Sequence, residues 1–126
     1  MNGGVMILHF NFIKDLVISV AYLVPLLIFW RLRGSSSDEV ASPLNYVLAG
    51  FLVGFLVRFV GSLFYNYVIQ IPLLPVKLHE EGVPFEFIAR TMTLYNTAFT
   101  ITYIVSLFTS LLLITYGVYR LVTILR

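Results

Sequence analysis

The stretch that decides the fold is Ala49-Gly50-Phe51-Leu52-Val53-Gly54-Phe55-Leu56-Val57-Arg58-Phe59-Val60-Gly61, because it belongs to a long apolar run that only one charge interrupts. The apolar run continues on both sides, and it is long enough for a helix of about 20 residues that crosses a hydrocarbon core of about 30 Å. Two further apolar blocks lie before and after it in the chain. We therefore expect an integral membrane protein.

The composition agrees with a membrane environment. The chain has 126 residues, of which 60% are hydrophobic and 11% charged, and its mean hydropathy is +0.95. Soluble domains have roughly 45–50% apolar and 25% charged residues. The absence of cysteine excludes disulfides and thiolate metal sites. The net charge of +2, with no basic cluster, argues against nucleic-acid binding.

The sequence predicts an all-α integral membrane protein with a single domain over residues 1–126. The three transmembrane helices are expected at about 16–32, 44–71 and 87–119, with short polar links at 33–43 and 72–84. Residues 1–15 either lie in the membrane interface or extend the first helix outward.

Prolines and basic residues refine this outline. Pro25 is expected to kink the first helix, and Pro43, after a capping Ser42, is expected to open the second. Basic residues near the span ends divide unequally between the two sides of the membrane, which predicts an outside N-terminus and a cytoplasmic C-terminus. The inner side carries Arg31, Arg33, Arg120 and Arg126, and the outer side carries Lys14, Lys77 and Arg90.

The charge within the second span lies on a face rich in glycine. At about 100° per residue, Gly50, Gly54, Arg58, Gly61 and Tyr65 fall within one quadrant of the helix. Gly50 and Gly54 form a GxxxG pair, which lets another helix backbone approach closely. We expect this face to contact a neighbouring helix, in this chain or in another.

Arg58 itself needs a partner, because a permanent charge at mid-bilayer costs at least roughly 2.5–3.5 kcal/mol. Its position, about 13 residues from either end of the predicted span, puts both interfaces beyond the reach of its side chain. Every carboxylate of the chain is expected at another depth, with Asp15 at the outer end of the first span. The sequence thus directs the search to another subunit, an anionic lipid or ligand, or neutral acceptors.

The third helix offers hydroxyl and amide groups on two faces. Thr93, Asn96, Thr97 and Thr100 share one face, which we expect to pack against polar groups of a neighbour, and the other face carries Thr102, Ser106, Thr109 and Ser110. The competing interpretation is that these side chains bond to carbonyls of their own helix.

No catalytic constellation is visible. The spans contain hydroxyls without histidine or carboxylate beside them, and there is no glycine-rich phosphate loop, so we expect no enzyme activity and no catalytic residues. His9 and His79 lack the spacing of a metal site, and neither lies within a span to ligate haem. We expect no metal and no cofactor held by this chain alone.

Three functions fit these features. The leading hypothesis is a non-catalytic accessory or structural subunit of a respiratory, oxidase or transport complex, docked to other membrane subunits through Arg58 and the glycine face. The first alternative is a homo-oligomeric anion channel or transporter with Arg58 lining the pathway. The second is a self-assembling membrane protein whose Arg58 binds an anionic lipid.

Overall fold

The computed structural model describes the backbone of residues 2–126 and the side chains of residue 4 and residues 6–126. All of its regular elements are helical, and no strand occurs in the described residues. In chain order they are α1 (Asn2–Gly34), α2 (Asp38–Leu63), the π-helical turn η1 (Phe64–Val68), the 3-10 turn η2 (Ile71–Leu73), α3 (Leu74–Glu80) and α4 (Phe85–Leu125). The predicted all-α class is therefore confirmed.

Three segments are long and apolar enough to cross a membrane: Met6–Gly34, Asp38–Glu80 and Phe85–Leu125. Within their most apolar windows only 6%, 28% and 6% of the residues are buried by the rest of the chain. The large apolar side chains that remain exposed need another apolar medium to cover them, and a lipid bilayer supplies one. The three predicted transmembrane helices are thus present as candidate spans.

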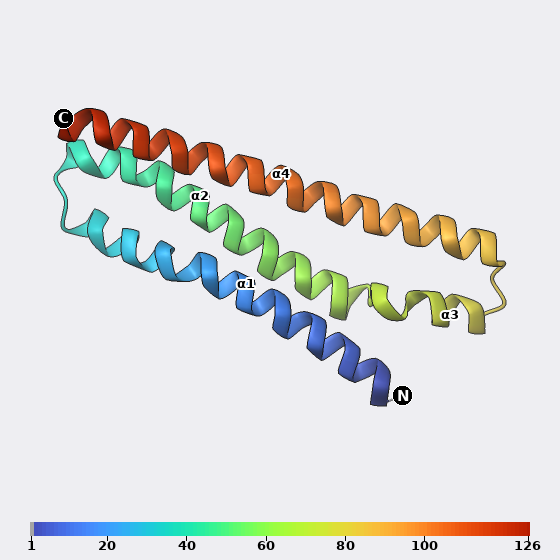
Figure 1. Ribbon diagram of the computed structural model, residues 1–126. Helices are drawn as coiled ribbons and strands as arrows, with labels where there is room; N and C mark the ends of the chain where they lie inside the picture. The colour runs from blue at the N-terminus through green and yellow to red at the C-terminus, as the bar shows by residue number, and fades with distance from the viewer. Residues whose placement is uncertain (1) are drawn as a thin grey trace.

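The helices lie side by side, with α2 in the middle and antiparallel to α1 and α4 on its two flanks (Figure 1). Aromatic pairs fix the register on both sides of α2. Phe29 of α1 stacks on Phe51 with ring centres 5.8 Å apart, and Tyr46 meets Tyr116 of α4 edge-on at 4.8 Å. The chain therefore forms two antiparallel hairpins that share the central helix.

The second helix begins earlier than expected. It starts at Asp38 after an N-cap at Ser37, so the prediction that Pro43 opens this helix is wrong. Asp38 and Glu39 occupy the first turn, where carboxylates interact favourably with the positive end of the helix dipole. Pro43 lies buried one turn further on, inside the helix.

The second helix also ends earlier, at Leu63 rather than near Ile71. The π-helical turn follows, and the Ile69 amide donates to the Phe64 carbonyl at 2.9 Å. Gln70 then adopts a left-handed conformation with φ 57° and separates this turn from η2. Proline at the start of η2 and of α3 begins a new helix, so much of the expected polar link at 72–84 is helical.

The first and third long helices extend beyond the predicted spans. Residues 2–15 continue α1, and the helix runs through Pro25 without interruption. The helix α4 has 41 residues and is about 60 Å long, roughly twice the thickness of a hydrocarbon core.

Candidate functional site

The glycines of the Arg58 face are sites of close contact within the chain. A Cβ added to Gly50 would lie 2.8 Å from the Ser110 carbonyl oxygen of α4, and the Ser110 hydroxyl donates to the Gly50 carbonyl at 2.7 Å. A Cβ on Gly61 would lie 3.1 Å from the Tyr103 ring, also on α4.

Gly54 lies against the helix on the other flank, α1. A Cβ there would lie 2.5 Å from Cδ1 of Tyr22, so the tyrosine ring of α1 occupies the space that the missing side chain leaves. The glycine stripe of α2 thus accommodates both flanking helices of the same chain, because Gly50 and Gly61 face α4 and Gly54, between them, faces α1.

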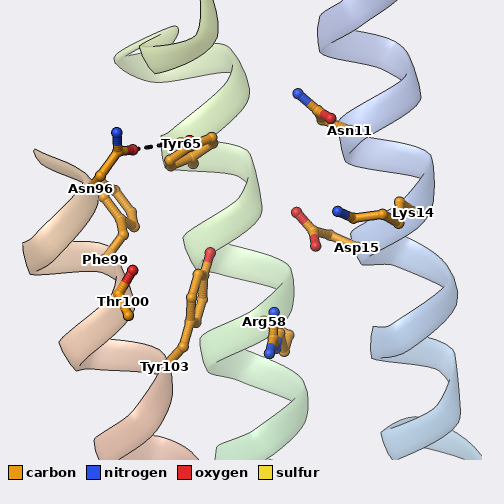
Figure 2. A pocket seen from close by; sticks show the side chains of 9 residues that line it. All are labelled: Asn11, Lys14, Asp15, Arg58, Tyr65, Asn96, Phe99, Thr100 and Tyr103. Atoms are coloured by element: carbon orange, nitrogen blue, oxygen red, sulfur yellow. Dashed lines mark hydrogen bonds between the residues drawn. The ribbon is translucent and has the colours of Figure 1, made fainter. Parts of the chain in front are cut away.

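A polar cavity of about 270 Å³ around Arg58 is lined by side chains of all three long helices (Figure 2). Figure 2 shows side chains of α1 directed toward α2, with Arg58 between them and the side chains of α4. The cavity is partly open, and its lining residues are Asn11, Lys14, Asp15, Arg58, Tyr65, Asn96, Phe99, Thr100 and Tyr103.

Arg58 lies in this cavity with its guanidinium carbon 4.5 Å from the centre of the Tyr103 ring. A cation over an aromatic face is favourable by about 0.5–2 kcal/mol, depending on how far it is desolvated. Within the described residues no hydrogen-bond acceptor or ion-pair partner reaches the guanidinium. The contact with Tyr103 orients Arg58 and leaves its N–H donors available to a group that enters the cavity.

Asp15, which the sequence predicts at another depth than Arg58, lines the same cavity. The Ser62 hydroxyl donates to Oδ2 of Asp15 at 2.9 Å, which ties α1 to α2 at this level. Ser62 is one helical turn from Arg58, about 6 Å along the axis. The second apolar block is not one continuous span to Ile71, because α2 ends at Leu63, and this changes the depth expected for Arg58.

A buried polar chain supports Asp15. The side-chain amide of Asn66 donates to the carbonyl and to the hydroxyl of Ser62, at 3.0 and 3.1 Å. Both residues are almost fully buried, and Oδ1 of Asn66 has no partner among the described residues. On α1, the Ser19 hydroxyl donates to the Asp15 carbonyl at 2.8 Å. The bond from Ser62, itself held by Asn66, positions the Asp15 carboxylate at the edge of the cavity.

One pattern in the sequence indicates this chain of bonds. Polar residues recur at intervals of four, as Asp15 with Ser19 and Ser62 with Asn66, which places each pair on one face of its helix. The pairing of the two faces depends on the register between α1 and α2, which no single helix specifies.

The residues of the expected polar face of the third helix, α4, do not all contact the same neighbour. The Tyr65 hydroxyl donates to Oδ1 of Asn96 at 3.2 Å, and Thr100 lines the cavity. Thr93 donates to the Ala89 carbonyl of its own helix, and with Thr97 it borders a separate apolar groove. On the other face, Ser110 makes the interhelical bond to Gly50.

The cavity lining offers charged, hydroxyl and amide groups that can donate or accept hydrogen bonds. Among the described residues no group of three or more histidine, cysteine, aspartate or glutamate side chains is arranged to hold a metal ion. Nδ1 of His9 shares a hydrogen bond with the Tyr67 hydroxyl at 2.8 Å, outside the cavity lining. Comparisons with protein-family models, with curated proteins and with solved structures each return no match.

Proposed function

We propose that the protein is a non-catalytic accessory subunit of a multi-subunit membrane complex of respiratory, oxidase or transport type, and that the Arg58 cavity holds an anionic group in that complex. The observation that carries this proposal is the Arg58 guanidinium, which stands in an open cavity on Tyr103 and has no acceptor among the described residues. A guanidinium in an open polar cavity can donate charge-assisted hydrogen bonds to an anionic group that enters it.

The charges that line the cavity favour an anion. Lys14 and Arg58 carry positive charges and Asp15 carries a negative one, so the lining has a net charge of about +1 at neutral pH. An anionic group that enters would accept charge-assisted hydrogen bonds from Arg58, which are roughly twice as strong as neutral ones.

The length of the helices supports a place in a larger assembly. Both α4 and α1 exceed the thickness of a hydrocarbon core, and their outer ends still expose large apolar side chains. Phe10 of α1 is 70% exposed and Phe85 of α4 is 82% exposed. Apolar surface of this kind, placed outside a bilayer, is typical of a protein–protein interface.

The glycine face contributes less to docking than the sequence indicated, because Gly50, Gly54 and Gly61 contact helices of the same chain. Docking is therefore proposed through the outer apolar surfaces of α1 and α4, with Arg58 contributing through its cavity. No observation in the described residues favours the anion-channel alternative.

The test is purification from native membranes in a mild detergent, comparing wild type with Arg58→Leu. Arg120→Leu is the matched control, since Arg120 lies near the far end of α4 beside Tyr116. We expect wild type and the control to co-purify with other subunits at fixed stoichiometry, and Arg58→Leu to lose part of that association. A monodisperse particle that contains this chain alone, unchanged by Arg58→Leu, would contradict the proposal.

A further inference from the structure

We infer that the Arg58 cavity receives the headgroup of a phospholipid that carries a primary amine, with the phosphate at Arg58 and Lys14 and the ammonium at Asp15. This inference deepens the proposed function and rests on it in one respect, namely that Arg58 binds an anionic group. It names the source of that group as a lipid and adds a second recognition element, the Asp15 carboxylate.

The first argument is the level of the cavity along the helices. The charge-free segment of α1 runs between Asp15 and Arg31, and that of α2 runs between Glu39 and Arg58. These segments, 16–30 and 40–57, contain 15 and 18 residues and are about 22 and 27 Å long. Their lengths are close to one hydrocarbon thickness of about 30 Å. We therefore place the charged groups of the cavity at one end of this apolar layer, at the level of lipid phosphates, rather than at the mid-bilayer depth that the sequence predicts for Arg58.

The second argument is the presence of both signs of charge across a small cavity. A simple anion would satisfy Arg58 and Lys14 but would lie near the Asp15 carboxylate, which repels it. A zwitterionic headgroup satisfies both sides, because its ammonium offers donors to Asp15 while its phosphate accepts from Arg58. Ser62 donates to only one oxygen of Asp15, which leaves the other with acceptor capacity toward the cavity.

The third argument is the shape of the space. The ring of Tyr22 occupies the place beside Gly54, one turn of α2 from Arg58 on the side toward the helix N-terminus. The cavity is thus a local opening of about 270 Å³ rather than a groove along the whole helix layer. A transmembrane helix of a partner, about 10 Å in diameter with its side chains, needs a continuous groove. A compact headgroup does not.

The experiment measures which lipids the purified protein retains. The protein is equilibrated in mixed micelles that contain equal mole fractions of phosphatidylethanolamine, phosphatidylcholine and phosphatidylglycerol, and bound lipids are counted by native mass spectrometry. For wild type we expect roughly tenfold more phosphatidylethanolamine than phosphatidylglycerol, since the amine adds a charge-assisted bond to Asp15.

Two variants separate the roles of the charges. Asp15→Asn preserves an acceptor for the Ser62 hydroxyl and removes the negative charge, so the preference for the amine lipid should fall to about equal binding while phosphatidylglycerol is retained. Arg58→Leu should reduce retention of all three lipids. Asp38→Asn, which alters a carboxylate in the first turn of α2, is the control and should leave the pattern unchanged.

The outcomes distinguish the two proposals. If wild type prefers phosphatidylglycerol, or if Asp15→Asn keeps the amine preference, the headgroup assignment is wrong while an anion site at Arg58 still stands. If Arg58→Leu retains all three lipids as wild type does, the headgroup assignment and the anion site of the proposed function both fail.

Discussion

Replacing Gly50 by alanine tests a close contact between the backbones of α2 and α4. The new Cβ would lie 2.6 Å from Cγ1 of Ile114 and 2.8 Å from the backbone oxygen of Ser110. Carbon atoms in contact are normally about 3.5–4.0 Å apart, so α2 and α4 would have to separate by several tenths of an ångström or more. The Ile114 side chain can move aside, but the Ser110 carbonyl belongs to the backbone of α4 and cannot.

The expected cost follows from three terms. Overpacking costs typically about 1–3 kcal/mol. Stretching the bond from Ser110 to the Gly50 carbonyl adds roughly 0.6 kcal/mol, the average for a side-chain bond between membrane helices. The better helix propensity of alanine returns roughly 0.5–1 kcal/mol. We expect a net loss of about 1–3 kcal/mol in the free energy of unfolding.

The measurement is reversible unfolding in mixed detergent micelles, followed by circular dichroism. Gly34→Ala is the matched control, because a Cβ at Gly34 meets nothing within 4 Å. The double variant Gly50→Ala with Ile114→Ala should recover only part of the loss, since the backbone clash remains. The reasoning is refuted if Gly50→Ala and Gly34→Ala have the same stability within about 0.5 kcal/mol, the usual range for harmless substitutions.

Three further predictions follow from other contacts. Ser62→Ala removes one hydrogen-bond partner each from the Asn66 amide and from Asp15, so it should lower the free energy of unfolding by about 1–3 kcal/mol. Thr102→Ala is the control, because the Thr102 hydroxyl bonds its own helix and its loss should change stability little; equal costs for the two variants would argue against the buried polar chain. Gly61→Leu should displace the Tyr103 ring from Arg58 and lower lipid retention, while Gly34→Leu should not, and unchanged retention in Gly61→Leu would show that the ring position is unimportant. Trp30, the single tryptophan, lies 66% exposed near the end of α1 opposite the cavity, so lipids labelled near the headgroup should quench its fluorescence more than lipids labelled near the chain end; the reverse order would contradict the assigned span.

The fold class was predictable because apolar length alone specifies membrane helices. Three blocks of sufficient length, separated by serine, proline and charged residues, predicted three helices, and the structure confirms them. The helix limits were less predictable. Pro43 was assigned to a helix start because proline favours that position, but the acidic pair Asp38 and Glu39 extends the helix by another turn.

The cavity was only half predictable. Arg58 stands out in the sequence because a charge within an apolar run is rare and costly. Asp15 could not be matched to it, since their proximity depends on the register between α1 and α2. That register is determined by contacts such as Tyr22 beside Gly54, in which the shape of one helix surface meets the absence of a side chain on another.

The central position of α2 bears on how the protein is made. Its two extensive contact surfaces join α2 to the long helix before it and the long helix after it in the chain (Figure 1). A chain synthesised from its N-terminus can therefore pair α1 with α2 while α4 is still unmade, and no helix has to wait for a distant partner. The helix α4 is made after α2 and can then pack on it, with Gly50 of α2 against the Ser110 carbonyl and Gly117 of α4 against the Pro43 carbonyl, so these close backbone contacts can form after α1 and α2 have paired.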